Sequence, residues 1–294
     1  MNTTWSEHVQ GINTLYMSRK LRFDDMFFDQ YDKNFGLDRE KELRILEIGC
    51  GPGALAEALK RWYPKAKITA VDRDSAFVEY ASANISGVEF IEGDATKLPF
   101  EDNTFDVTIS NTVQEHVEPE AFWGEQLRAL KPGGICLCLS ARRGIYSSAP
   151  CVMETQEEKA FWEKARPWQE VNETYQVCQY PMNEAEIPMS MEQNGFTAVT
   201  TGYAVIDLTP DAPKYPAEMA EAMIDTQRQT SLEAVTSAEL PGTEKIIDII
   251  NSKYDERLRL YRNGIRQWDT SVSVTMIIRG IKPTGGRFSD RPEK

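Results

Sequence analysis

The sequence predicts an α/β protein built on a mostly parallel sheet. Apolar runs of about five residues recur from residue 43 onward, and amphipathic stretches of about ten to fifteen residues separate them. A glycine-rich stretch, "LEIGCGPGALAEAL" at 46–59, follows the first apolar run and opens the first helical pattern. This alternation is typical of βαβ units, whose strands are apolar on both sides because helices cover both faces of the sheet.

The elements follow one another in a regular order through the first half of the chain. Residues 1–42 have a helical pattern that stops near Gly36, and we expect them to form an N-terminal helical lid. The alternating core then spans 43–140. Its expected strands are "LRILEI" (43–48), "KITAVD" (67–72), "VEFIEGD" (88–94), "FDVTISN" (105–111) and "GGICLCLS" (133–140).

The alternation stops after residue 140. We expect 141–182 to form a helical insertion, in which Pro167 ends or kinks a helix. The remaining expected segments are a core helix and strand (183–208), a helical cap insertion (209–268), the last core strand (269–283) and a disordered tail (284–294). The two late strands bring the predicted sheet to seven.

Composition excludes several classes of partner. The 294 residues include 33 Lys and Arg against 46 Asp and Glu, a net charge of −13, and no basic stripe is present to neutralise phosphates. Nucleic acid is therefore a poor candidate ligand. No apolar run approaches the ~18 residues of a membrane span, and the N-terminus does not resemble a signal peptide. Five scattered cysteines indicate reduced thiols and a cytoplasmic location.

The glycine-rich turn admits more than one ligand. Read as G-x-G-x-x-G/A, Gly49, Gly51 and Ala54 would suit a dinucleotide, with Asp72 on the ribose. Glu47, just before the turn, argues against that reading because a carboxylate repels a pyrophosphate and suits an ammonium or sulfonium group. An NAD(P)-dependent oxidoreductase stays open as an alternative, as does a turn that binds nothing.

Four motifs, in order, resemble the class I S-adenosylmethionine-dependent methyltransferases, of the small-molecule, methyltransferase type 11-like kind. They are "LEIGCGPG" (46–53), "AVDRDSAFVEYA" (70–81), "FIEGDATKLPFEDNTFDVTISNTVQEHVEP" (90–119) and "LRALKPGGICLCLS" (127–140). The resemblance covers 43–140 and, more loosely, 183–206 and 270–283. It implies a Rossmann-like, doubly wound, seven-stranded sheet, mostly parallel with the last strand antiparallel, that carries helical cap insertions and binds S-adenosyl-L-methionine.

The resemblance also implies roles for individual residues around the methionine part of the cofactor. Gly49, Gly51 and Gly53 would let the loop backbone approach it, and Glu47 would hold its ammonium group. Asn111, just past the fourth expected strand, would line the same end.

At the adenosine end, Asp72 would accept hydrogen bonds from both ribose hydroxyls. Arg73 stands where the family usually has an aliphatic residue, and its guanidinium would stack on the adenine. Asp94 would accept from the adenine amino group, and the backbone N–H of Ala95 would donate to a ring nitrogen.

Two further assignments keep alternatives. In the lid, Tyr16 with Arg19 or Arg22 would meet the cofactor's carboxylate, or these residues would form a solvated helix face. His116, in "NTVQEHVEP", would be a general base or a packing residue, and Glu115 would orient it or face solvent.

Together these patterns predict methyl transfer to a small-molecule acceptor by in-line displacement, mainly through proximity and orientation. A non-catalytic, cofactor-binding partner subunit is the other alternative, and the helical insertions leave room for a homodimer contact. We expect no metal site, because Cys136 and Cys138 alternate on a buried strand as small apolar side chains.

Overall fold

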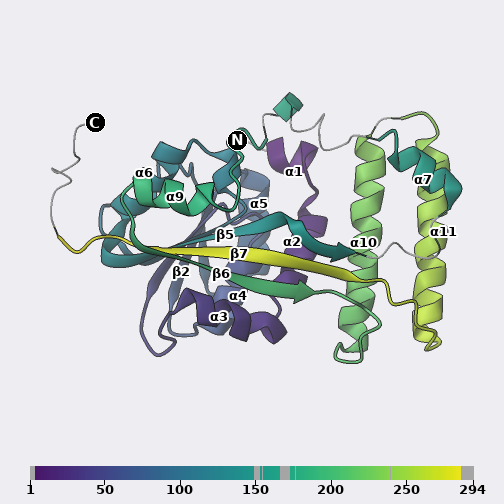
Figure 1. Cartoon of the computed structure of the whole chain (residues 1–294), viewed down its shortest axis with the longest axis horizontal. Helices are drawn as coiled ribbons and strands as arrows, with labels where there is room; N and C mark the ends of the chain where they lie inside the picture. Colours follow the sequence, from purple (N-terminus) through teal and green to yellow (C-terminus); the bar gives the residue numbers. More distant parts are fainter. Residues whose placement is uncertain are drawn as a thin grey trace.

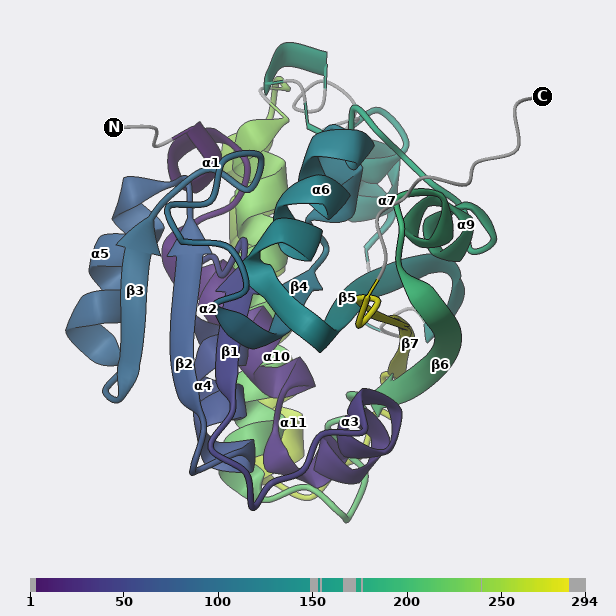
Figure 2. The same cartoon turned by 90° about the vertical axis from the view of Figure 1, so that its left-hand side faces the viewer.

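The computed structural model describes residues 4–148, 153, 155–165, 173–175, 177–238 and 240–285, so Pro167 and most of the expected tail lie outside the described residues. One seven-stranded sheet has the order β3-β2-β1-β4-β5-β7-β6 (Figures 1 and 2). Its strands are β1 (Arg44–Ile48), β2 (Lys67–Asp72), β3 (Val88–Glu92), β4 (Phe105–Asn111), β5 (Leu130–Ser148), β6 (Thr197–Asp207) and β7 (Ser271–Ile281).

Strand directions confirm the predicted fold class. The pairs β1–β2, β1–β4, β2–β3 and β4–β5 are parallel, whereas β7 is antiparallel to both of its neighbours, β5 and β6. The strand order reverses between β1 and β4, because successive strands run outward from β1 in one direction and from β4 in the other. Such a switch point leaves a crevice at the carboxyl ends of the strands, where open α/β sheets bind ligands.

Helices cover both faces of the sheet, as the continuous apolar strands require. On one face α3 (Phe28–Phe35) and α4 (Ala54–Trp62) pack over Ile45, and on the other α6 (Pro119–Ala129) and α9 (Glu186–Gln193) pack over Leu46. Cys136 and Cys138 both lie buried in the second cluster, as small apolar side chains on one side of β5.

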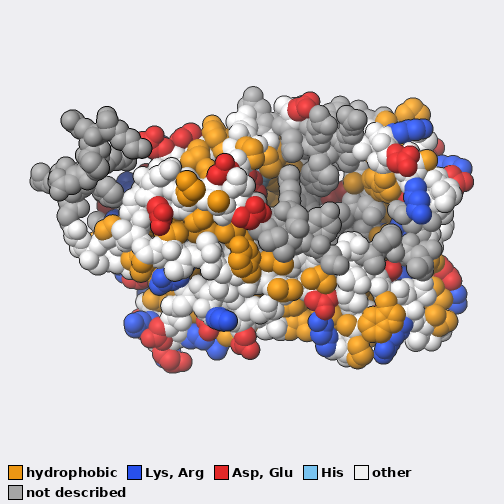
Figure 3. Space-filling view, viewed as in Figure 1, with side chains coloured by type: hydrophobic (Ala, Val, Ile, Leu, Met, Phe, Trp, Pro, Cys, Tyr) orange, Lys and Arg blue, Asp and Glu red, His pale blue; other side chains and the backbone are white. Residues whose placement is uncertain are grey.

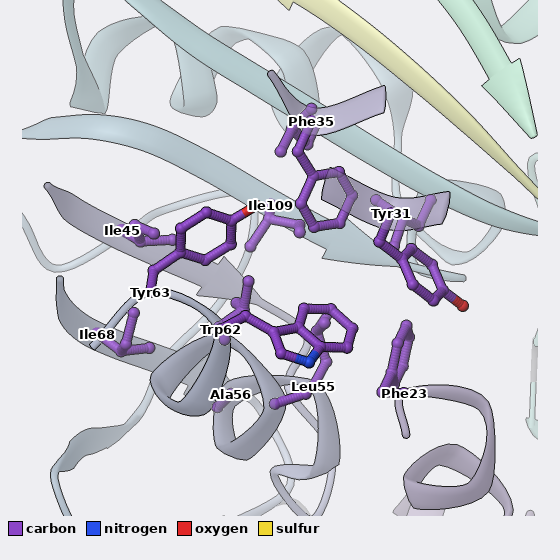
Figure 4. Close-up of a cluster of buried hydrophobic side chains, with 14 of the residues drawn as sticks. Phe23, Tyr31, Phe35, Ile45, Leu55, Ala56, Trp62, Tyr63, Ile68 and Ile109 are labelled. Carbon is purple, nitrogen blue, oxygen red and sulfur yellow. The ribbon is translucent and has the colours of Figure 1, made fainter. Parts of the chain in front are cut away.

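An aromatic cluster fixes the N-terminal helices to the sheet (Figure 4). The ring of Trp62 at the end of α4 stacks on Tyr31 of α3 at 5.3 Å, and the Phe23 ring meets it at 6.3 Å. The Trp62 indole N–H donates to Asp25 Oδ1 at 2.8 Å, so this large buried side chain leaves no unpaired donor. The cluster holds the segment after α2 (Ile12–Arg22) against the sheet.

A helical hairpin stands beside α2 (Figure 1). It consists of α10 (Ala217–Ser237) and α11 (Thr243–Arg262), the two helices expected in the cap. Leu21 of α2 packs with Tyr215 and Met223 in one buried cluster, and Thr14 Oγ1 donates to Glu233 Oε1 of α10 at 2.5 Å. The hairpin therefore packs against α2 and helps to hold it in place.

One element differs from the sequence expectation. Residues 141–148, expected to begin a helical insertion, continue β5 and pair with the first residues of β7 after a register shift. The partner residues Ser271, Val272 and Ser273 lie far along the chain. Pairing between distant, partly polar segments leaves no local apolar run from which a strand could be predicted. The short helix α7 (Gln156–Trp162) follows within the expected insertion.

The surface shows mixed charge on the face drawn in Figure 3, where acidic and basic side chains are interspersed.

Within the described part of the chain, no helix is both long and apolar enough to cross a membrane.

A buried charge cluster anchors α11. Arg257 is 1% exposed, and it donates from Nη2 to Asp211 Oδ2 and from Nε to Asp269 Oδ2, both at 2.6 Å. Asp211 also accepts the backbone N–H groups of Gln267 and Trp268. One guanidinium thus joins α11 to the segments that precede α10 and β7.

Replacing this arginine should be costly. Arg257→Ala leaves Asp211 and Asp269 buried without a cation, so we expect the free energy of unfolding to fall by about 3–5 kcal/mol. Urea denaturation followed by circular dichroism measures it. Arg259→Ala, which removes an exposed arginine paired with Glu256, is the control and should leave the midpoint unchanged. Equal midpoints for both variants would contradict the anchoring role.

Candidate functional site

A cavity of about 330 Å³ lies at the carboxyl ends of β1, β2, β3 and β4, at the switch point of the sheet. The loops that follow these strands form one wall. Residues of α1 (Thr4–His8) and α2 lie across it: Trp5, Leu15 and Arg19 line the cavity, and Leu15 Cδ2 is 3.5 Å from the place a Cβ on Gly51 would occupy. The N-terminal helices therefore close the crevice that the sheet leaves open.

The three glycines of the turn do two different jobs. Gly49 and Gly51 line the cavity with φ of +69° and +53°. Gly53 has φ of +91° but does not line it; a Cβ there would lie 2.6 Å from Ile85 Cδ1 and 3.1 Å from Ala81 Cβ. Gly53 thus differs from the other two glycines: its missing side chain lets α4 pack on α5 (Ser75–Asn84).

Glu47 lies inside β1 at the base of the cavity. It is 1% exposed, the backbone N–H of Ala56 donates to its carboxylate, and its Oε2 has no hydrogen-bond partner in the described structure. Burial, with Asp72 nearby, raises the pKa of this carboxyl well above its ordinary value. A buried polar atom without a partner is unusual, and here it points to a cationic or hydrogen-bond-donating ligand group.

Asp72 at the end of β2 joins two loops. Its Oδ2 accepts the N–H of Gly51 at 2.7 Å, and its Oδ1 accepts the N–H of Asp74 at 2.9 Å. Burial raises its pKa against the effect of these two bonds. Each oxygen keeps lone-pair capacity toward the cavity that Asp72 lines, so the carboxylate can accept further hydrogen bonds there.

The other residues that the sequence analysis expected at the adenosine end also line the cavity: Arg73, Asp94 and Ala95. Asp94 Oδ1 accepts from the Thr96 N–H and hydroxyl, both at 2.8 Å, which closes a turn after β3. Asn111, at the end of β4, lines the cavity as well.

The lid residues separate into different positions. The Tyr16 hydroxyl donates to Glu57 Oε2 at 2.8 Å and does not line the cavity. Arg19 does line it, and its Nη2 donates to Thr112 Oγ1 at 3.1 Å, just beyond the end of β4. Arg22 lies one turn further along α2, outside the lining. The structure therefore brings only Arg19 of these three to the cavity wall.

His116 lines the cavity with its ring held on two sides. Its Nδ1 accepts the backbone N–H of Cys178 at 3.0 Å, and the Trp5 ring meets it edge-on at 4.8 Å. Glu115 Oε1 is 4.0 Å from Nε2. Because Nδ1 acts as an acceptor, the neutral ring carries its hydrogen on Nε2. This arrangement favours a positioning role over a general base.

Several lining residues escaped the sequence analysis as site residues: Trp5, Gln10, Thr112 and Gln179. Gln179 and Tyr180 arrive from a distant segment, where the Tyr180 N–H donates to the carbonyl of Glu115 at 2.9 Å. Trp5 is placed by its neighbour Ser6, whose N–H and hydroxyl both donate to Asp74. Only its aromatic character could have pointed to Trp5. In the described ranges no cluster of three or more His, Cys, Asp or Glu residues could hold a metal ion.

Comparison with known proteins shows which proteins this chain is similar to. Residues 46–138 match a family model described as a methyltransferase domain. A fatty-acid O-methyltransferase of Mycolicibacterium smegmatis is 32% identical over 172 residues, which are 48% of this chain and 62% of that protein. A demethylmenaquinone methyltransferase of Clavibacter sepedonicus is 41% identical over 100 residues, which are 32% of this chain and 40% of that protein. The matches thus span less than two thirds of either relative.

A solved structure shows the same architecture over nearly the whole chain. Phosphoethanolamine N-methyltransferase 2 of Haemonchus contortus, in complex with S-adenosyl-L-methionine, has a TM-score of 0.54 and 19% identity, and covers 96% of this chain and 60% of that one. At this identity the likeness concerns the fold alone. The motifs at the ends of β1 to β4 and the family match show that residues 46–138 of this chain are similar to methyltransferase domains.

Proposed function

We propose that this chain binds S-adenosyl-L-methionine in the cavity at the switch point and transfers its methyl group to a small-molecule acceptor. The observation that carries the proposal is the buried Oε2 of Glu47, which has no hydrogen-bond partner in the described structure and stands two residues before Gly49. It suits the ammonium group of a methionine moiety, and it is poorly suited to a pyrophosphate. When bound, the cofactor supplies a methyl group carried on a sulfonium.

The wall of the cavity offers complementary groups in the order that the cofactor needs. Asp94 and Ala95 after β3 would bind the adenine and Asp72 after β2 the ribose, with Arg73 beside them. Glu47 would then bind the ammonium group, beside a loop backbone that Gly49 leaves open.

Arg19 would bind the carboxylate of the methionine moiety. Leu15, one turn earlier on α2, lies over Gly51, so α2 passes directly above the glycine turn before it reaches Arg19. The Arg19 guanidinium is fixed by Thr112 and keeps donors for a carboxylate. Tyr16, committed to Glu57, would act only by supporting the helix.

The residues of this chain would act by orientation and by excluding water. The Ser6–Asp74 hydrogen bonds hold Trp5 and α1 across the cavity, where they would shield the reacting atoms from solvent. The Nδ1 atom of His116 already accepts the Cys178 N–H, so we expect the ring to act by its position at the cavity wall.

The relatives support a small-molecule acceptor without fixing it, because their names specify different acceptors, a fatty acid and demethylmenaquinone. The matches to methyltransferases do not favour an NAD(P)-dependent oxidoreductase. Buried Cys50 and Cys136 are free thiols, which supports the cytoplasmic location proposed from the sequence.

Neutralising Glu47 tests the assignment. We expect Glu47→Gln to weaken binding of S-adenosylhomocysteine about 10- to 100-fold, because an amide cannot compensate the ligand's ammonium group. Isothermal titration calorimetry measures the dissociation constant. Glu57→Gln, an equal charge change on α4 outside the cavity, should leave it unchanged. Tight binding of NAD(P) with no response to S-adenosylhomocysteine would instead support the oxidoreductase.

The raised pKa of Glu47 makes binding depend on pH. In the ligand-free protein the carboxyl keeps its proton above its ordinary range, whereas an ammonium ligand needs the carboxylate. Binding should therefore release a proton, and affinity should rise with pH from the ordinary carboxyl range until the raised pKa is passed. Calorimetry in two buffers of different ionisation enthalpy measures the proton release. The same release in Glu47→Gln would show that another group is responsible.

A further inference from the structure

Both histidines of the chain lie where three segments meet over the cavity. The sequence contains two histidines, His8 and His116. The His116 ring, in the turn after β4, meets Trp5 of α1 edge-on at 4.8 Å. The His8 ring of α1 stacks on Tyr175, with the ring centroids 4.7 Å apart. Ring contacts of the two histidines therefore join α1 to the turn after β4 and to Tyr175.

Two hydrogen bonds join the segment 177–180 to the turn after β4. The Tyr180 N–H donates to the carbonyl oxygen of Glu115 at 2.9 Å, and the Cys178 N–H donates to Nδ1 of His116 at 3.0 Å. The first acceptor is a carbonyl oxygen, which accepts at any ordinary pH. The second is a ring nitrogen, which accepts only while it carries no proton. A proton can therefore remove one of the two bonds.

The position of α1 depends on contacts at both of its sides. The helix has five residues, too few to be stable by itself. On the β2 side of the cavity, Ser6 donates two hydrogen bonds to Asp74. On the β4 side, Trp5 contacts the His116 ring. The ring that accepts the Cys178 N–H thus also supports the helix that lies across the cavity.

Charged and titratable groups stand on each element around the His116 ring. They are Glu7 and His8 on α1, Arg19 on α2, Glu115 and Glu118 around the turn after β4, and Cys178 and Tyr180 in the segment 177–180. Glu115 Oε1 is 4.0 Å from Nε2 of the ring and favours its protonated form. Arg19, which interacts with Glu115 by charge, opposes that form. Protonation thus removes a partner at Nδ1 and strengthens the interaction with a carboxylate at Nε2.

We propose that His116 is a proton-controlled latch, a residue whose neutral ring keeps the cavity closed over its ligands. The inference rests on the proposed function, because the ligands are the methyl donor and the acceptor. When the ring takes a proton from solvent, Nδ1 carries a hydrogen and faces the Cys178 N–H as a second donor, so their hydrogen bond is lost. The wall formed by Gln179 and Tyr180 is then released, and Trp5 loses a fixed neighbour.

The latch gives the site a dependence on pH. Histidine ordinarily titrates between about pH 5 and 8, so the ring is neutral and the cavity closed at the upper end of this range. The cavity opens as the pH falls through the titration of the ring. Release of the product S-adenosylhomocysteine, which requires an open site, should therefore become faster at lower pH.

Two substitutions separate the hydrogen bond from the packing of the ring. His116→Asn places an amide oxygen near the position of Nδ1, an acceptor that is not protonated in this pH range. His116→Phe keeps an aromatic ring beside Trp5 and offers no acceptor. The first variant should therefore stay closed at every pH of the range, and the second should stay open.

The dissociation rate of S-adenosylhomocysteine, measured by stopped-flow displacement, tests the latch. From about pH 8 to about pH 5.5, the ratio of the wild-type rate to the His116→Asn rate should rise about tenfold. The ratio is used because Glu47 also loses charge as the pH falls, in both proteins alike. At the higher pH, His116→Phe should release the ligand about tenfold faster than wild type.

Three outcomes would contradict the inference or its basis. An unchanged ratio across the range, or slow release from His116→Phe, would overturn the latch. His8→Phe keeps the stack on Tyr175 and cannot be protonated, so it should retain the wild-type pH dependence. A dependence that is lost in His8→Phe and kept in His116→Asn would assign the effect to His8 and overturn the inference. No binding of S-adenosylhomocysteine to the wild-type protein would instead defeat the proposed function.

A measurement without ligand follows the hydrogen bond itself. Amide hydrogen exchange, read by mass spectrometry at about pH 8, compares peptides that contain Cys178 in the three proteins. We expect about tenfold faster exchange in His116→Phe than in wild type, and exchange close to wild type in His116→Asn. Equal exchange in all three proteins would overturn the latch whether or not the proposed function holds.

Discussion

The carboxylate of Asp72 holds together the two loops that form the wall of the cavity. It accepts the N–H of Gly51 from the loop after β1 and the N–H of Asp74 from the loop after β2. Asp74 in turn caps α5 and accepts hydrogen bonds from the N–H and the hydroxyl of Ser6. One chain of hydrogen bonds therefore connects the glycine turn, the end of β2 and the helix that closes the cavity. Removing Asp72 would release the loops as well as a ligand contact, which makes Glu47 the cleaner probe of binding.

A second dependence runs through the lid. α2 lies between the strand ends and the α10–α11 hairpin, and Thr14 and Leu21 contact the hairpin on its outer side. The hairpin is held by Arg257, whose partners precede α10 and β7. The position of Arg19 at the cavity wall therefore depends on a segment some two hundred residues away, roughly the separation of Thr14 from Glu233. In the proposed enzyme, the late insertion would hold α2 in place without contributing to the cavity wall.

The sequence predicted what local patterns determine. Strands β1, β2 and β4 end at the residues where the predicted strands end. Asp72, Asp94 and Asn111 line one cavity because parallel strands place their carboxyl ends at one edge of the sheet. The extension of β5 to Ser148 could not be predicted, since its pairing partner is 271–273.

The direction in which individual side chains point could not be predicted from the sequence either. Gly53 shares the motif with Gly49 and Gly51, yet its missing Cβ is needed against α5. Tyr16 and Arg19 are one turn apart, and only packing decides that one meets Glu57 and the other Thr112. Tertiary contacts decide which of two neighbouring side chains faces the cavity, and the spacing of residues in the sequence does not reveal those contacts.

The distribution of charge suits the proposed methyl donor. Glu47, Asp72 and Asp94 lie on the β1–β3 side of the cavity, whereas Arg19 lies toward β4, where it bonds Thr112. The ammonium and carboxylate groups of a methionine moiety would each meet charge of the opposite sign. Such interactions are stronger where water is excluded, so α1 lying over the cavity would strengthen the binding of the donor.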